Sequence, residues 1–249
     1  MVKQFICLGI ESTAHTFGIG IITSGLDKIP YTTLDGTGRI VRDTFEDTEN
    51  AYIISYGLPL ADRFGSIYGG ASLKFITQNF SKISGASAFG YDLDLGVLYR
   101  LDDFSLGVLL QKGVQLSWSN GHQDAGPFTM KFGISNKLKL YKSISLLGSA
   151  DLIQRQRDPM FINAGCELGF SGLKKKSSVS VDGLFLRFGV DNYAFENRYG
   201  NSDQINGSLN LNTGAGINMS LAGCRLQIDY VSGMYRLGDK TRISINIFI

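Results

Sequence analysis

The sequence predicts an all-β protein, an antiparallel transmembrane β-barrel of about 12 strands. Three observations support this: the composition, a two-residue alternation, and the length of the alternating segments. Glycine accounts for 31 of the 249 residues and proline for only 4, against usual shares of about 7% and 5%. Hydrophobic residues make up 43% of the chain, too many for a disordered protein. No run of about 18 apolar residues occurs, which argues against a membrane-spanning helix.

From about residue 48 onward, apolar and polar residues alternate with a period of two, as in strands with two unlike faces. The clearest stretch is 90–101, whose apolar positions are Tyr91, Leu93, Leu95, Val97, Tyr99 and Leu101. Its other positions are Gly90, Asp92, Asp94, Gly96 and Arg100, and only Leu98 breaks the pattern. The alternation returns in residues 104–111, 160–170, 208–219, 224–230 and 242–249.

Most of these segments are about 9–15 residues long, which suits membrane strands of about 9–11 residues better than soluble strands of about 5–6. Their polar positions carry Gly, Ser, Asn and Asp rather than the Lys, Glu and Thr typical of a face in bulk water. Aromatic residues lie near the ends of the apolar positions, as in the girdles of membrane barrels. A soluble β-rich binding module is the alternative that the alternation leaves open.

The connections expected between strands fall into two alternating sets. The longer set comprises residues 25–49, 81–86, 118–125, 154–159, 191–205 and 235–240. The shorter set comprises residues 59–64, 102–103, 138–141, 171–177 and a turn near Leu221. Outer-membrane barrels have long outer loops and short periplasmic turns. The expected location is therefore the outer membrane, with membrane lipid as a partner.

Charge, cysteines and histidines argue against several other functions. The formal net charge is +2, too small a basic excess for nucleic-acid binding. Cys7, Cys166 and Cys224 are widely spaced, and His15 and His122 stand alone, so zinc-binding spacing is absent. We expect no cofactor, no metal and no enzymatic activity.

Three polar clusters are better explained as solvated connections than as chemistry. Ser117, Ser119, His122 and Asp124 surround an Asn-Gly turn signal, and a catalytic triad requires facing geometry rather than sequence adjacency. The acidic residues in the first long connection are Asp43, Glu46, Asp47 and Glu49, which lack EF-hand spacing. Residues 174–176, three lysines, fall in a short connection.

Charged residues at polar positions of the strands are the candidate site. In a closed barrel such side chains face the lumen, where they pair with one another and shape any pore. The lumen-facing candidates are Asp92, Asp94, Arg100, Glu167, Arg187, Arg225 and Asp229.

Residues 17–249 contain an ordered series of motifs. They are Gly18-Ile19-Gly20-Ile21-Ile22, Ile29-Pro30-Tyr31-Thr32-Thr33, Asn50-Ala51-Tyr52, Gly69-Gly70 before Leu73-Lys74, and Gly90-Tyr91-Asp92-Leu93-Asp94-Leu95-Gly96. This series resembles the PorV/PorQ family of outer-membrane proteins. The resemblance implies the fold of FadL-type fatty-acid transporters with about fourteen strands, of which an N-terminal part is absent here. It also implies type IX-like secretion, with secretion components or cargo as partners, or uptake of apolar molecules.

Residues 6–20, Ile6-Cys7-Leu8-Gly9-Ile10-Glu11-Ser12-Thr13-Ala14-His15-Thr16-Phe17-Gly18-Ile19-Gly20, resemble a different family. They look like the start of the TsaD-like tRNA threonylcarbamoyltransferase subunit of KEOPS-type complexes. That resemblance implies the first strand and phosphate-facing turn of an ATPase domain, and makes a fragment of such an enzyme the alternative function. The expected organisation is one barrel domain over residues 1–249, with residues 1–22 as an atypical N-terminal segment.

Overall fold

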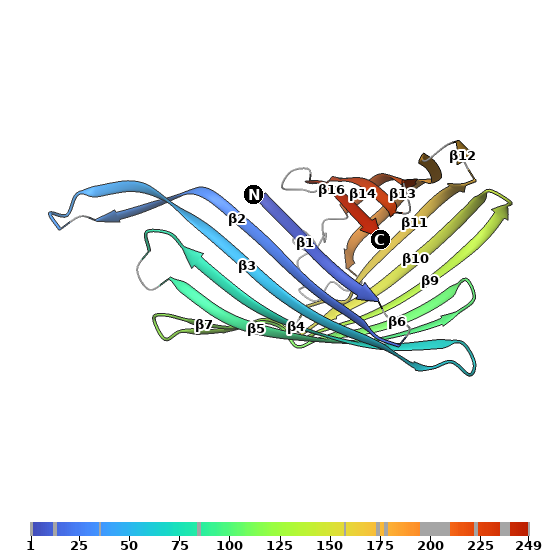
Figure 1. Cartoon of the computed structure of the whole chain (residues 1–249). Helices are drawn as coiled ribbons and strands as arrows, with labels where there is room; N and C mark the ends of the chain where they lie inside the picture. The colour runs from blue at the N-terminus through green and yellow to red at the C-terminus, as the bar shows by residue number, and fades with distance from the viewer. Residues whose placement is uncertain are drawn as a thin grey trace. The chain divides into compact units, whose positions relative to one another are not determined.

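The computed structural model describes residues 2–11, 14–34, 36–83, 86–156, 158–172, 175–176, 179–194, 210–221, 224–234 and 240–248. Regular structure in these ranges is β-strand throughout, as the alternation predicts (Figure 1). Within the same ranges, no helix is long and apolar enough to cross a membrane. The all-β, antiparallel fold class is confirmed.

The strands follow one another along the chain. They are β1 (Val2–Glu11), β2 (Thr16–Leu34), β3 (Ile40–Ala61), β4 (Ser66–Phe80), β5 (Ser87–Leu101), β6 (Phe104–Gln111), β7 (Gln115–Trp118), β8 (Gln123–Ala125), β9 (Thr129–Tyr141), β10 (Ile144–Arg155), β11 (Phe161–Ser171), β12 (Lys175–Lys176), β13 (Val179–Ala194), β14 (Asn210–Leu221), β15 (Cys224–Met234) and β16 (Lys240–Phe248). Most of the principal strands are 9 residues or longer, as the membrane-strand prediction requires.

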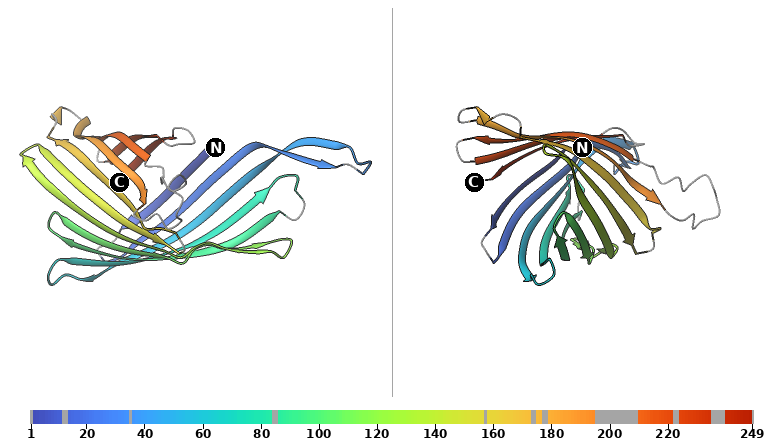
Figure 2. Two further views of the ribbon diagram at one scale, coloured as in Figure 1. Left: turned by 180° about the vertical axis from the view of Figure 1, so that it is seen from behind. Right: turned by 90° about the vertical axis from the view of Figure 1, so that its right-hand side faces the viewer.

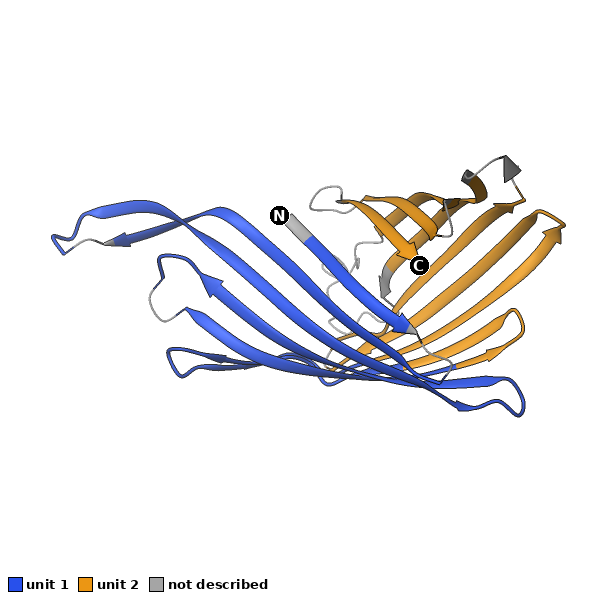
Figure 3. Cartoon of the chain, in the orientation of Figure 1, with its two compact units in different colours: residues 1–98, 109–129 blue, residues 99–108, 130–249 orange. Residues whose placement is uncertain are grey.

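The chain divides into two compact units (Figure 3). Unit 1 comprises residues 1–98 and 109–129, and unit 2 comprises residues 99–108 and 130–249. In unit 1 the strand order is β1-β2-β3-β4-β5, with β7 paired to β5 and β8 to β7. In unit 2, β9, β10, β11, β13, β14, β15 and β16 pair in that order, and β12 pairs with β13. Strands β1 to β5 of unit 1 and strands β13 to β16 of unit 2 each lie beside their sequence neighbours (Figure 2). The expectation of one domain stays a prediction.

The short connections lie close to where the sequence places them. β5 and β6 are joined by Asp102 and Asp103 alone, and Asp102 takes a left-handed φ of 52°. Aspartate tolerates this conformation better than most residues. The connection between β4 and β5 is residues 81–86, as expected.

Three expected connections are wrong. Residues 138–141 are the end of β9, which continues to Tyr141, so the turn before β10 is at residues 142–143. Residues 25–49 are mostly strand, because β2 continues to Leu34 and β3 begins at Ile40. Residues 118–125 are not one loop, since β7 and β8 form a hairpin there. The strand before them also breaks after Gln111. Gly113 has a φ of 88°, and a side chain at this position would collide with the Gly126 carbonyl oxygen.

The two faces of the strands differ in the way that the alternation predicts, but their burial is the reverse of a soluble sheet. We call the side with Gly90, Asp92 and Asp94 the polar face, and the side with Tyr91 and Leu95 the apolar face. On β5, Asp92 is 7% exposed whereas Leu95 is 47% exposed. No side chain among the described residues is fully buried. A soluble sheet gains its stability by covering its apolar face, and here that face is open.

The same reversal occurs in unit 2. Asp229 on β15 is 8% exposed. Ile245 lies on the apolar face of the neighbouring strand, β16, and is 63% exposed. Phe188 on β13 is also open, at 57%. Each unit therefore presents large apolar side chains outward and keeps charged groups on the more protected side.

Candidate functional site

Charged side chains gather in two groups on the polar face, one in each unit. β5 positions the first group because a strand turns alternate side chains to opposite faces. Ala88, Gly90 and Asp92 are buried in succession, while Phe89 and Tyr91 between them are exposed. Asp94 continues the same row. The alternation in the sequence therefore determines that both aspartates share one face.

The first group, the Lys74 cluster, consists of Lys74 on β4 with Asp92 and Asp94. The Nζ atom of Lys74 lies 3.1 Å from Asp92 Oδ2 and 2.6 Å from Asp94 Oδ2. Gln111 also donates a hydrogen bond from Nε2 to Asp94 Oδ2, at 3.1 Å. Each of the three charged side chains is less than one fifth exposed. One ammonium group thus neutralises two protected carboxylates only in part.

The Oδ1 atoms of Asp92 and Asp94 are buried and accept no hydrogen bond from the described residues. A carboxylate that is removed from water without full pairing costs free energy. Lys74 is therefore essential to this arrangement, because its removal would leave two protected carboxylates without a cation.

The second group, the Arg187 cluster, consists of Arg187 on β13, Glu167 on β11 and Asp229 on β15. Arg187 Nε lies 2.6 Å from Glu167 Oε2, and Arg187 Nη1 donates to Asp229 Oδ1. Gln227 adds a hydrogen bond from Nε2 to Asp229 Oδ2, at 2.8 Å. The planar guanidinium group suits such a bridge because it presents several donors in fixed directions.

Glycines allow Arg187 to reach across an intervening strand. β14 lies between β13 and β15, and it places Gly214 opposite Arg187 and Gly216 opposite Asp229. A side chain at Gly216 would collide with Asp229 Oδ1 and approach Arg187 Nη1 to 3.0 Å. The absence of a side chain at Gly216 therefore allows Arg187 on β13 and Asp229 on β15 to form their ion pair across β14.

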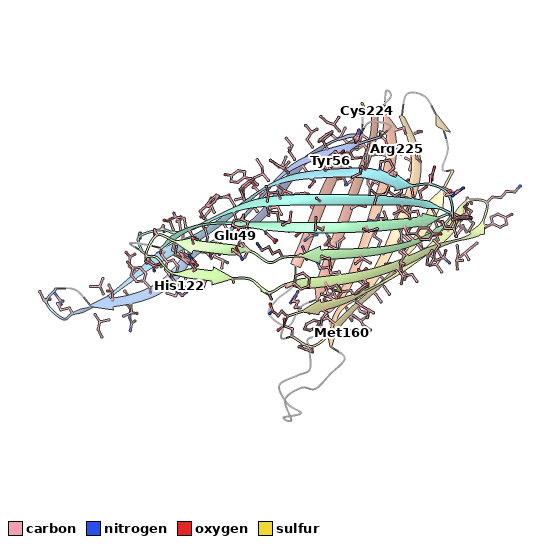
Figure 4. The ribbon with its side chains drawn as sticks, turned by 90° about the horizontal axis from the view of Figure 1, so that it is seen from below. Glu49, Tyr56, His122, Met160, Cys224 and Arg225 are labelled. Carbon is pink, nitrogen blue, oxygen red and sulfur yellow. The ribbon has the colours of Figure 1, made fainter. Side chains whose placement is uncertain are left out.

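The structure thus places five of the seven sequence-predicted residues in these two clusters. The other two lie elsewhere. Arg100 is an exposed residue near the end of β5. Arg225 is exposed on β15, directly opposite Ser220 and Phe248 of its neighbours (Figure 4). The sequence analysis did not include Lys74 among the lumen-facing candidates. It could have been found there, because Lys74 occupies a polar position in the alternation of β4.

The serine, histidine and aspartate residues near the Asn-Gly turn do not form a triad. His122 Nε2 lies 3.0 Å from Asp124 Oδ1, so these two side chains meet. Ser119 Oγ instead bonds to Ser87 Oγ, at 3.2 Å. Gly121 has a φ of 86°, as a tight turn at this glycine requires. The structure confirms a turn between β7 and β8.

The acidic residues of the first expected connection lie on β3 and divide between its faces. Asp43, Asp47 and Glu49 alternate along one face and Glu46 lies on the other. In the described ranges, no group of three or more His, Cys, Asp or Glu side chains is arranged to hold a metal ion. Lys175 and Lys176 form the short strand β12, and residue 174 lies outside the described residues.

Chemically, the two clusters can hold neighbouring strands together and set the charge of the polar face. Each contains one basic and two acidic side chains, which leaves a local excess of one negative charge. Interactions between such charges are stronger where water is partly excluded. The polar face therefore carries paired charged side chains, and the apolar face carries exposed hydrocarbon side chains.

No protein-family model matches the chain, and no curated protein matches its sequence. The solved structures that are similar in fold include the following two. CdiB from Escherichia coli has a TM-score of 0.55 and 9% identity, over 99% of this chain and 52% of CdiB. The toluene transporter TodX from Pseudomonas putida has a TM-score of 0.53 and 10% identity, over 98% of this chain and 80% of TodX. This chain spans about half the length of CdiB. In fold, it is similar to these outer-membrane β-barrel proteins.

Proposed function

We propose that the chain is an outer-membrane β-barrel protein that carries apolar solutes and performs no catalysis of its own. The observation that carries this proposal is the exposure of the apolar face. Leu95, Phe188 and Ile245 are 47%, 57% and 63% exposed, and many other large apolar side chains of both units are equally open.

Lipid is the solvent that this face requires. Monomeric soluble proteins rarely expose continuous apolar patches larger than a few hundred Å². Membrane strands alternate between residues that face lipid and residues that face the lumen. The lower exposure of Asp92 and Asp229, at 7% and 8%, agrees with a polar face turned away from that lipid. Membrane lipid is therefore the proposed partner, and the outer membrane the proposed location, because the strands have the antiparallel arrangement found there.

The likeness to TodX supports apolar solutes as the transported class. TodX is a toluene transporter, and this chain covers 80% of the TodX chain. The identity of 10% means that the likeness concerns the fold, so the solute class is our proposal for this chain. A transport role also requires no nucleic acid or cofactor.

Protein secretion of the PorV/PorQ type is the second candidate, and the ordered motifs favour it. Asn50-Ala51-Tyr52 lies on β3, Gly69-Gly70 and Leu73-Lys74 lie on β4, and the run from Gly90 to Gly96 lies on β5. Each of these motifs thus lies within a strand. Secretion components or cargo would then be the partners. The TsaD-like resemblance of residues 6–20 stays a prediction, and residues 6–11 and 16–20 belong to the antiparallel β1–β2 pair.

Uptake by cells tests the proposed transport. Cells that produce the chain would be compared with cells that produce Leu95→Arg, which we expect to assemble poorly, and Leu101→Arg, its matched control. Faster uptake of a radiolabelled aromatic hydrocarbon with the wild type and the control supports transport. Uptake equal to that of empty cells, with the protein present in the membrane fraction, would overturn it and leave secretion as the candidate to test.

A further inference from the structure

Four aromatic rings form a row across unit 1, on strands β2, β3, β4 and β7. Tyr31 and Phe45 are 6.0 Å apart between ring centroids, and Phe45 and Phe80 are 5.7 Å apart, both edge to face. Phe80 and Trp118 are stacked, with centroids 5.6 Å apart and an interplanar angle of 3°. We call these four side chains the aromatic row. All four are half-buried.

The strand register places the aromatic row on the polar face. Asp47 of β3 lies directly opposite Phe80 of β4. Phe45 shares that face because it is two residues from Asp47 along the strand. Ala88 lies directly opposite Trp118, and it alternates in phase with Asp92. A row of rings on the face that otherwise carries charge is unexpected if the rings serve only to meet lipid.

Three carboxylates accompany the aromatic row on the same face. Asp47 is paired across the strands with Phe80, and such directly opposite side chains have Cβ atoms about 5 Å apart. Glu49 is the next residue of β3 on this face and lies opposite Gln78. Asp124 accepts a hydrogen bond from Trp118 Nε1 at 2.6 Å, so it is attached to the end of the row.

None of these three carboxylates has a lysine or arginine partner among the described residues. Asp47 accepts only from Gln78 Nε2, at 3.1 Å, and Asp124 contacts His122. Glu49 is exposed on β3 (Figure 4). Asp43, on the same face, differs because Lys82 pairs with it at 3.1 Å. The row therefore lies in a region with an uncompensated negative charge.

Aromatic rings and carboxylates together form a surface suited to organic cations. The faces of the rings attract an alkylammonium group through their quadrupoles, and the carboxylates attract its charge. Packing between strands would explain the rings, but not three carboxylates beside them that have no lysine or arginine partner among the described residues. We propose that the aromatic row with Asp47, Glu49 and Asp124 binds a polyamine-type organic cation. This inference goes beyond the proposed transport function, because binding at this face needs no passage of a solute.

Trp118 gives a direct readout because it is the only tryptophan of the sequence. The full chain, in zwitterionic detergent at constant ionic strength, would be titrated with spermidine while Trp118 emission is recorded. Equilibrium dialysis with labelled spermidine would measure binding independently. We expect saturable binding by both methods, and no saturable emission change with magnesium chloride at the same total charge.

Two glutamates of β3 provide matched variants. Glu49→Gln removes a charge beside the aromatic row, whereas Glu46→Gln removes the same charge from the opposite face of the same strand. We expect Glu49→Gln to weaken spermidine binding by roughly three- to tenfold, and Glu46→Gln to change it less than about twofold. Phe80→Leu should weaken binding while leaving all three carboxylates in place.

Absence of saturable binding by both methods would overturn the inference. Equal weakening by Glu46→Gln and Glu49→Gln would also overturn it, because only general charge attraction would then be present. An identical response to magnesium would exclude a role for the rings. These results are independent of hydrocarbon uptake, so the failure of this inference and the failure of the proposed function can be told apart.

Discussion

Arginine substitution at two positions of one strand distinguishes lipid from water as the solvent of the apolar face. Leu95 and Leu101 lie on the same face of β5 and are both 47% exposed. Leu95 is in the middle of the strand and Leu101 is its last residue. At about 3.3 Å per residue, six residues separate them by roughly 20 Å along the strand. Their contacts with the protein are thus comparable, while their depths in a bilayer differ.

The expected costs differ only if the face meets hydrocarbon. Arginine costs about 2–4 kcal/mol near the middle of a bilayer and about 0–1 kcal/mol near its surface. In water, replacement of an exposed leucine changes stability by about 0.5 kcal/mol or less at either position. We therefore expect Leu95→Arg to lower the free energy of unfolding by about 2–4 kcal/mol, and Leu101→Arg by less than about 1 kcal/mol.

The assay is reversible unfolding by urea in lipid vesicles, followed by the emission of Trp118. Asp94 is adjacent to Leu95 in sequence but lies on the polar face. Asp94→Asn should lower the free energy of unfolding less than Leu95→Arg does, because the asparagine keeps hydrogen-bonding groups for Lys74 and Gln111. Equal costs for the two arginine variants would refute the assignment of the apolar face to lipid. A negligible cost at Leu95 would refute it as well.

Three further outcomes follow from the polar face. Gly216→Val should lower the free energy of unfolding by about 1–3 kcal/mol by displacing an ion pair, while Gly148→Val, which meets open space, should be nearly neutral in the same urea titration. Lys74→Met should lower the free energy of unfolding in urea by about 1–3 kcal/mol. Lys139→Met, at an exposed lysine, should lower it by less than about 0.5 kcal/mol. The Thr44 amide and then the Lys82 ammonium lower the pKa of Asp43 below 3.8. This stabilisation is present above pH 3.8 and is lost as the pH falls through the lowered pKa. Acid titration of Asp43→Asn and wild type should therefore give stabilities that converge at low pH, and a constant difference would contradict the assignment.

Much of the fold is predictable because a strand between two unlike environments must alternate. The alternation in residues 90–101 gives both the strand β5 and its faces, and the structure places Asp92 and Leu95 on opposite sides as expected. Short turns are equally clear, since Asp102 and Asp103 interrupt two long alternating runs. These features depend on local sequence and on the solvent at each face.

The missed strand segment in residues 25–49 has a different environment. Residues 40–46 of β3 extend beyond the pairing with β4, which begins at Asp47 opposite Phe80. Residues 40–45 form their strand pairs with β2, and the Glu46 carbonyl oxygen accepts a hydrogen bond from Ser81 N. A two-stranded extension has no face that must be covered by other strands, so its sequence needs no alternation. Its charged residues therefore resemble those of a loop.

The clusters themselves could not be derived from alternation. A sequence pattern shows that Arg187 and Asp229 are on the polar face, but not that the glycines of β14 let them meet. Phe80 lies beside Asp47 because of the register between β3 and β4. The alternation within each strand does not show which residues of two strands lie opposite each other. Lys74 and the aromatic row depend on this information.

The location of natural cysteines allows the most direct test of the central claim, that hydrocarbon covers the apolar face. Cys166 lies mid-strand on β11, opposite Phe188 on the apolar face, and Cys7 lies opposite the buried Gly20 on the other face. A bimane fluorophore would be attached to each in single-cysteine variants, which are then reconstituted in vesicles with brominated lipid chains. The account predicts strong quenching at Cys166 and weak quenching at Cys7. Absence of quenching at Cys166, or equal quenching at both positions, would contradict it.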